Sequence, residues 1–142
     1  MIFHLVLFKL KKDNSEEVLE NFFVGLKSLC VLGGVLSLKV NTINNGFYAG
    51  YDNRTKGYTH SLLVTLKDKH ALEKYDKDHF HGIVKQTIVK PALDLTQENP
   101  VLAVDWEEAD PASKLLAMAS LSAAAGVVAL VGLLALRYRS RL

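Results

Sequence analysis

The chain has 142 residues, 49% of them hydrophobic, and a formal net charge of +2. Three of its 17 basic residues are Arg137, Arg139 and Arg141, so the rest of the chain is close to neutral. It carries no basic stripe of the kind that binds nucleic acid. The single cysteine, Cys30, excludes an internal disulfide. Length and composition therefore indicate one compact domain followed by one apolar segment.

An uncharged segment over 115–136 has the length of a membrane span. It reads LLAMASLSAAAGVVALVGLLAL, and as a helix its 22 residues measure roughly 33 Å, against about 30 Å for the hydrocarbon core of a bilayer. We therefore predict a transmembrane helix over 115–136, with the lipid bilayer as its partner. A hinge over 109–114 precedes it and a basic C-terminal end over 137–142 follows. A buried core helix is the alternative interpretation.

One face of this predicted span carries small side chains. They are Ala119, Ser122, Gly126 and Ala129. Such a face lets a second helix approach closely, so we expect other transmembrane helices of a membrane complex as partners. The short basic end is similar to the tail anchors of organellar membranes, and this analogy predicts a mitochondrial rather than a plastid or peroxisomal membrane. The opening MIFHLVLF has no basic residues before its apolar run and does not match a signal peptide.

The first part of the chain predicts a strand, a helix and a second strand. Residues 2–10 predict a strand with apolar side chains on both faces. Asn14 is the expected N-cap of the helix, which ends before Gly33 and Gly34. Its apolar stripe consists of Val18, Leu19, Phe22, Phe23, Leu26, Leu29 and Cys30. Alternation over 35–42 predicts a half-exposed strand.

The remaining elements complete a β-α-β-β-α-β order over 1–108. After a turn-rich segment, 43–57, they are a strand over 58–66, a helical region over 70–93 capped by Asp68 and broken near Gly82, and a strand over 101–107. This is the order of the ferredoxin-like α+β fold. Helices cover only one face of such a sheet, yet the first strand is apolar on both. We therefore predict a homodimer in which two sheets pack face to face.

Several short motifs resemble one known family. They are the opening His4-Leu-Val-Leu-Phe-Lys-Leu-Lys, the Gly57-Tyr-Thr-His60 before the third strand, and Tyr75 followed six residues later by His81. Together, over residues 1–107, they resemble the stress-responsive dimeric α/β-barrel (Dabb) family and its plant polyketide cyclases. The resemblance implies that His4 and His60 line a pocket and that Tyr75 and His81 are catalytic.

The segment before His81 departs from the family pattern. The family commonly has His-Pro-Ala-His, whereas this chain has Asp78-His79-Phe80-His81, without the proline that interrupts the helix. Six residues make about 1.7 turns of an α-helix. A more continuous helix is therefore expected to turn His81 away from Tyr75.

These side chains have a chemical and a structural interpretation. A neutral His81 can remove a proton α to a carbonyl while Tyr75 donates a hydrogen bond to the enolate oxygen. Alternatively, both are structural parts of a helix. His4 and His60 are either semi-buried histidines, bonded to each other, to the backbone or to Tyr75, or the polar lining of one cavity. The spacing around His79 gives no obvious chelate, so we expect no metal and no cofactor.

The sequence favours one function and leaves others open. The favoured hypothesis is a non-catalytic, membrane-anchored accessory or assembly subunit of an organellar membrane complex. The first alternative is a membrane-tethered enzyme of the polyketide-cyclase or lyase type, with His81 as general base and Tyr75 as hydrogen-bond donor. A further alternative is a self-assembling module without a small-molecule role.

Overall fold

A computed structural model of the chain describes residues 1–109, and residues 1–108 form one compact unit. The predicted hinge beyond 109, the span over 115–136 and the basic end over 137–142 lie outside the described residues. No helix within 1–109 is both long enough and apolar enough to cross a membrane.

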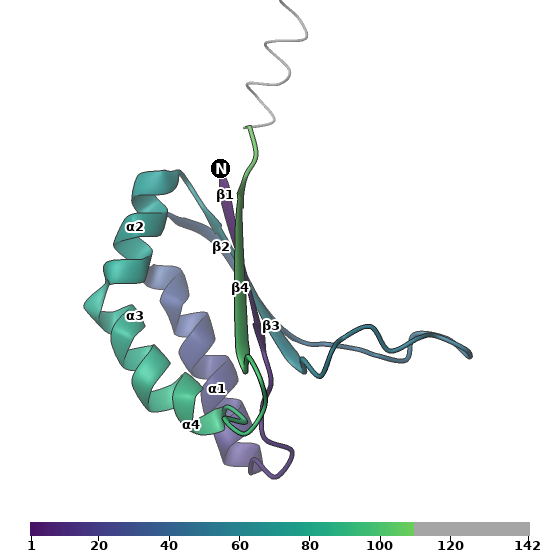
Figure 1. Cartoon of the computed structure of the whole chain (residues 1–142). Coiled ribbons are helices and arrows are strands. Elements are labelled where there is room, and N and C mark those ends of the chain that lie inside the picture. The colour runs from purple at the N-terminus through teal and green to yellow at the C-terminus, as the bar shows by residue number, and fades with distance from the viewer. Residues whose placement is uncertain (110–142) are drawn as a thin grey trace, which may run out of the picture. The chain divides into compact units, whose positions relative to one another are not determined.

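The described residues form a four-stranded antiparallel sheet with all helices on one face (Figure 1). Its strands are β1 (Ile2–Phe8), β2 (Val35–Thr42), β3 (His60–Leu66) and β4 (Val101–Glu107), in the order β2-β3-β1-β4. The first strand is central and therefore paired on both sides. This arrangement confirms the predicted ferredoxin-like α+β fold.

Helix α1 (Glu16–Ser28) packs its apolar stripe on the sheet, with Phe22 and Leu26 buried. Its N-cap is Ser15, whose hydroxyl accepts a 3.3 Å hydrogen bond from the Val18 amide. The prediction of Asn14 as the cap is therefore wrong. The Asn14 side-chain amide instead donates a 2.8 Å hydrogen bond to the Ala92 carbonyl and ties the start of α1 to the end of the helical layer. A short 3-10 turn, η1 (Leu29–Val31), ends this segment.

The second helical region consists of four consecutive pieces. They are α2 (Lys69–Lys77), α3 (His79–Val84), a π-helical turn η2 (Lys85–Val89) and α4 (Lys90–Ala92). Asp68 caps α2 as predicted, accepting a 2.9 Å hydrogen bond from the Ala71 amide. The break lies at Asp78, whose ψ of 134° is extended, and not near Gly82. Gly82 stays helical because its amide bonds to the Asp78 carbonyl at 3.0 Å.

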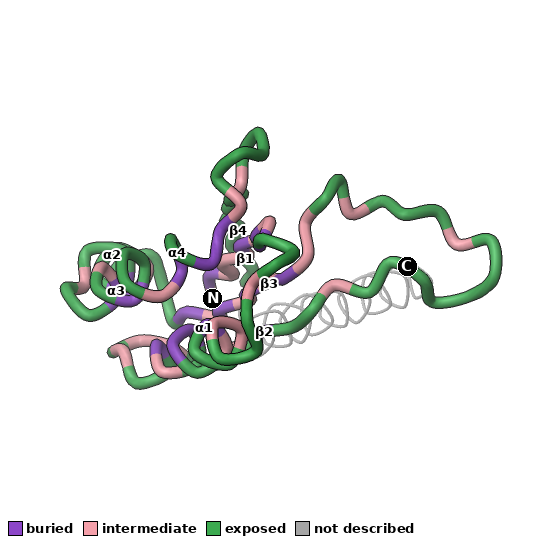
Figure 2. The backbone as a smooth tube through the Cα atoms, turned by 90° about the horizontal axis from the view of Figure 1, so that it is seen from below, coloured by how far each residue is buried: buried purple, intermediate pink, exposed green. Residues whose placement is uncertain are grey.

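The two faces of the sheet differ in what covers them. On the helix side, Ile2, Val6 and Phe8 of β1 are buried, together with the alternate residues of β3 (Figure 2). On the open side, the ring of Phe3 stacks on that of Trp106, with centroids 5.2 Å apart. The open side also carries Leu5, Leu7, Leu63, Leu102 and Val104. The prediction that β1 is apolar on both faces is confirmed, and among the described residues only one face has a helical cover.

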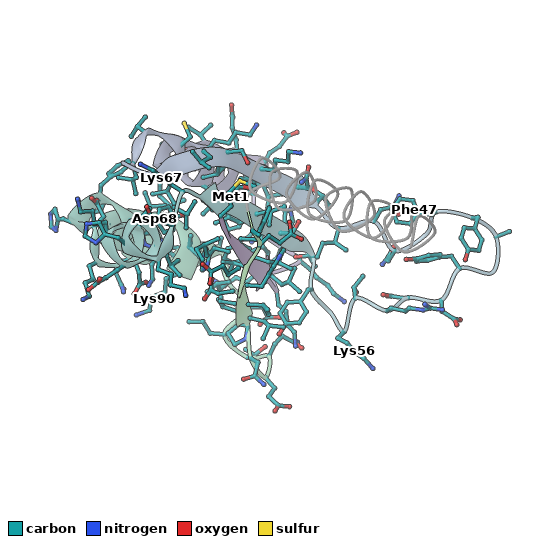
Figure 3. All side chains as sticks on the ribbon, turned by 90° about the horizontal axis from the view of Figure 1, so that it is seen from above. Met1, Phe47, Lys56, Lys67, Asp68 and Lys90 are labelled. Carbon is teal, nitrogen blue, oxygen red and sulfur yellow. The ribbon has the colours of Figure 1, made fainter. Side chains whose placement is uncertain are left out.

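The segment between β2 and β3, residues 43–59, projects away from the sheet on the side opposite the helices (Figure 1). We call it the arm. Figure 3 shows Phe47 and Lys56 on it, far from Lys90 in the helical layer. Phe47 and Tyr48 are 67% and 68% exposed, and the rings of both contact Tyr51 edge to face. The arm therefore presents aromatic side chains beside the open sheet face.

Candidate active site

Tyr75 and His81 lie against each other in the helical layer. Tyr75 is in the last turn of α2 and His81 in the first turn of α3, and their ring centroids are 4.4 Å apart at an interplanar angle of 36°. The expectation that the missing proline turns His81 away is wrong, because Asp78 interrupts the helix in its place. Its carboxylate accepts a 2.8 Å hydrogen bond from the Phe80 amide and starts α3 in a new direction.

Both side chains are buried, and each has a polar atom without a partner. Tyr75 is 1% exposed and His81 is 8% exposed. Neither the Tyr75 hydroxyl nor His81 Nδ1 has a hydrogen-bond partner in the described structure. Buried polar atoms without partners are rare because each one costs free energy. Such a pair is what a site leaves open for the polar atoms of a ligand.

Burial sets the protonation of this pair. It raises the pKa of Tyr75, which keeps the phenol protonated at neutral pH. Burial also lowers the pKa of His81 and the nearby charge of Lys85 lowers it further, and these effects outweigh the opposing effects of the Tyr75 and Asp76 backbone and of the Asp76 charge. At neutral pH the pair therefore consists of a phenol that donates a proton and a neutral imidazole that accepts one.

His4 and Asp105 form a second polar pair beside the first. His4 Nδ1 lies 2.7 Å from an Asp105 carboxylate oxygen, and the His4 ring meets the Tyr75 ring edge-on at 5.9 Å. Asp105 is a site residue that the sequence analysis missed. It lies directly opposite His4 in the β1–β4 register. The only sign of this in the sequence was the alternation of side chains along the two strands, which places both residues on the same face of the sheet. The carboxylate orients the imidazole so that its other nitrogen is free.

A cavity of about 480 Å³ lies between the sheet and the helices and is lined by His4 and His81. Most of its other lining residues are apolar, including Phe8, Leu29 and Val84. A hollow of about 360 Å³, lined by Tyr75, adjoins it, and the two share His4, Asp76 and Ala103. The cavity has the size and the apolar lining typical of small-molecule sites.

His60 lies away from this site. The strand register places it opposite Phe8, while His4 lies opposite Val64, four residues along β3. The Nδ1 atom of His60 is 2.9 Å from the Thr59 hydroxyl, and its ring packs against Phe22 and Phe23. Burial lowers the pKa of His60. The resemblance paired His4 and His60 in one pocket, and the structure brings only His4 to the cavity.

No metal centre accompanies the site in the part of the chain that the structure describes. Across residues 1–109, no three His, Cys, Asp or Glu side chains gather as metal ligands.

The fold and these residues agree with one protein family. The model of the Stress responsive A/B Barrel Domain (Dabb) matches residues 2–108 of the chain. The chain belongs to the Dabb family. No curated protein matches its sequence at a significant level.

Solved structures from several organisms share the fold of this Dabb protein. A protein of Arabidopsis thaliana is 22% identical, with a TM-score of 0.61 over 78% of this chain and 97% of its own. A hydroxynitrile lyase from Passiflora edulis is 14% identical, with a TM-score of 0.60 over 78% and 96%. A dimeric ferredoxin-like protein of unknown function from Thermobifida fusca is 18% identical, with a TM-score of 0.57 over 75% and 90%. At these identities the likeness concerns the fold alone.

Proposed function

We propose that this Dabb protein is a membrane-tethered acid–base enzyme that acts on a small apolar carbonyl compound. His81 is its general base and Tyr75 its hydrogen-bond donor. The observation that carries the proposal is the pair of buried polar atoms without partners, the Tyr75 hydroxyl and His81 Nδ1, on rings 4.4 Å apart. A purely structural pair would be expected to satisfy these atoms within the protein.

The reaction class that fits is proton removal α to a carbonyl. His81 Nδ1 takes the proton, the electron pair moves to the carbonyl oxygen, and the Tyr75 hydroxyl stabilises that oxygen by a hydrogen bond. The enolate carbon then attacks a second carbonyl of the same molecule, and the His81 imidazolium returns its proton to the new alkoxide. The step is an aldol-type ring closure, and it needs no oxidant and no cofactor.

Two likenesses support this class of chemistry. The motifs around His4, Tyr75 and His81 resemble those of olivetolic acid cyclase, a plant polyketide cyclase of the family. The Passiflora edulis structure is described as a hydroxynitrile lyase. In a lyase step of that kind, His81 would remove the hydroxyl proton of a cyanohydrin, and cleavage of a carbon–carbon bond would release the carbonyl compound and cyanide.

Neither reacting atom of the pair is open to solvent. A substrate in the cavity therefore reaches them only when a side chain of the cavity wall moves. We assign this movement to His4, because His4 lines both the cavity and the adjoining hollow that Tyr75 lines. Movement of His4 breaks its 2.7 Å hydrogen bond to Asp105, and water can then solvate the Asp105 carboxylate because that side chain is 47% exposed.

Proton exchange tests the proposed base without knowledge of the natural substrate. The probe is 4-phenylbutan-2-one in D₂O, with loss of its α-proton signals followed by NMR. We expect the wild type to catalyse exchange, His81→Gln to lose about 100-fold or more, and Tyr75→Phe to lose a comparable factor. Mandelonitrile, followed by the absorbance of benzaldehyde, tests the lyase step in the same variants.

The matched control is His60→Gln. His60 is also a buried histidine whose pKa burial lowers, but it does not line the cavity. We expect this variant to keep the wild-type rate. The proposal is wrong if the wild type is no faster than His81→Gln on both probes.

We further propose that the protein is a homodimer through the open face of its sheet. Several of the structurally similar proteins are described as dimeric. The open face carries a band of apolar side chains, and Leu102, Val104 and Trp106 are 41%, 46% and 40% exposed. A second copy is the simplest cover for such a band, because a twofold axis brings the same patch onto itself.

A second candidate function is supported by the uncharged segment over 115–136 and its small-residue face. It is an accessory or assembly subunit of a membrane complex in an organelle, with a mitochondrial membrane favoured over a plastid or peroxisomal one. Crosslinking in solubilised membranes, followed by native-gel mass spectrometry, tests it. We expect co-migration with other membrane proteins, and migration as a dimer of this chain alone would contradict the idea.

A further inference from the structure

One wall of the cavity carries three polar side chains that take no direct part in the proposed proton transfer. They are Lys85, Gln86 and Lys90, on η2 and at the start of α4. The residues around them, among them Val89, Leu93 and Leu95, are apolar. The cavity is therefore apolar along most of its length and cationic at one place.

The π-helical turn places the two lysines on the same wall. The Lys90 amide hydrogen-bonds to the Lys85 carbonyl, so the residues lie one turn apart along the helix. In a regular α-helix, five residues correspond to about 500°, which would leave the two side chains about 140° apart around the axis. The wider turn removes most of this difference, and both side chains line the cavity.

The charges on this wall are only partly compensated. Asp76 is the one acidic residue that lines the cavity, and its carboxylate lies 3.9 Å from Lys85 Nζ. No ion pair among residues 1–109 includes Lys90. Lys85, Lys90 and Asp76 together therefore give the cavity lining one uncompensated positive charge. This charge matches a monoanion, whereas a phosphate dianion would exceed it.

We propose that the cavity binds an apolar carboxylic acid whose carboxylate is held by Lys85 and Lys90. Gln86 adds an amide donor beside the two ammonium groups. This inference rests on the proposed function and names its substrate class: the apolar body fills the cavity, and the reacting carbonyl faces Tyr75 and His81. Charge-assisted hydrogen bonds of this type are stronger than neutral ones, so the acid should bind more tightly than an uncharged compound of the same shape.

A pair of matched ligands tests the proposal by binding alone. The probes are 4-phenylbutyrate and its neutral amide, 4-phenylbutanamide, titrated into the full-length protein in detergent by calorimetry at pH 7.5. We expect the wild type to bind the acid about tenfold or more tightly than the amide. Equal affinity for the two would overturn the proposal.

Variants show which residues hold the carboxylate of the ligand. The double variant Lys85→Met and Lys90→Met keeps the apolar stems and removes both charges, so we expect its preference for the acid to disappear. The control is Lys67→Met together with Lys27→Met, since neither residue lines the cavity and the net charge changes equally. Loss of the preference in the control as well would point to the overall field of the protein and would overturn the assignment.

The test separates this inference from the proposed function. His81→Gln should abolish proton exchange in the ketone probe but retain the preference for the acid. If the wild type exchanges the ketone protons but does not distinguish acid from amide, the substrate class is wrong and the enzyme assignment stands. If the preference is present and exchange is absent, the cavity binds acids without the proposed catalysis.

Discussion

The side chain of His81 packs on that of Tyr75, six residues earlier in the chain, with ring centroids 4.4 Å apart. In a straight α-helix these positions would lie on different faces. They meet because Asp78 ends α2 and caps α3. Asp78 interrupts the helix here through a side-chain hydrogen bond. The family pattern instead has a proline, whose ring constrains the backbone.

Replacement of Tyr75 by Phe should stabilise the fold while it removes the proposed proton-exchange activity. The buried hydroxyl has no partner, so its deletion removes a desolvation cost, and we expect the free energy of unfolding to rise by about 1 kcal/mol. Urea unfolding measures this. The control is Tyr58→Phe, whose hydroxyl donates a 3.1 Å hydrogen bond to the Asn99 carbonyl and should lose about 0.5 kcal/mol or more. A loss of stability in Tyr75→Phe would show that the hydroxyl is bonded within the protein.

Substitutions at the helix break should have opposite effects. Asp78→Ala removes the cap of α3 and should lower the free energy of unfolding by about 1 kcal/mol. His79→Pro should be tolerated or stabilise by about 0.5 kcal/mol, because Asp78 is extended and His79 is the first residue of α3. Thermal unfolding compares the two. Severe loss in His79→Pro would mean that the backbone at the break differs from the one described here.

The free energy of unfolding of the domain should decrease as the pH drops below 6.5, the ordinary pKa of histidine. Burial lowers the pKa of both His60 and His81 from 6.5, so the unfolded chain takes up protons there before the folded one does. The folded state therefore loses stability as the pH decreases through and below 6.5, and is unaffected above about 7.5. Urea midpoints between pH 7.5 and 5.5 measure this loss. His60→Gln and His81→Gln should each flatten the profile, and a profile that neither variant changes would contradict this account.

Two adjacent glycines should respond differently to alanine. Gly34 has a φ of +90°, and an added Cβ would overlap the Cβ of Ala71 at the start of α2. We expect Gly34→Ala to lower the free energy of unfolding by about 2 kcal/mol or more, because the backbone strain and the overlap act together. Gly33 has neither a positive φ nor a neighbouring atom in reach, so Gly33→Ala should be close to neutral. Equal effects would rule out this account of the turn.

A charge on the open sheet face should dissociate the proposed dimer. In Trp106→Asp or Val104→Asp the carboxylate would be buried against a second copy without a partner, which is costly. Light scattering after size-exclusion chromatography should show a monomer for either variant, with a folded circular-dichroism spectrum. Val24→Asp, on the exposed side of α1, should remain dimeric. A wild type that is monomeric at micromolar concentration would contradict the dimer itself.

Much of the fold could be predicted from local patterns. The two apolar faces of β1 and the cap at Asp68 depend on residues close in sequence, and each is present in the structure. The alternation predicted for β2 holds from Leu38 onward, whereas Leu36 is 55% exposed because the register shifts between Val35 and Ser37. The cap at Ser15 could not be predicted in this way. The Asn14 side chain, the expected cap, is instead bonded to a distant partner, the carbonyl of Ala92. Burial periodicity is a local property, whereas the choice between two adjacent polar residues was settled by a contact 78 residues away.

The ferredoxin-like order of elements could be predicted from periodicity, which neighbouring residues carry, and the candidate pair Tyr75 and His81 was implied by the family resemblance of short motifs. The three-dimensional arrangement was needed to show that the two rings meet, that Asp105 bonds to His4 from 101 residues away, and that His60 lies apart from the cavity. Strand register sets the last two, and register depends on pairing across the whole sheet.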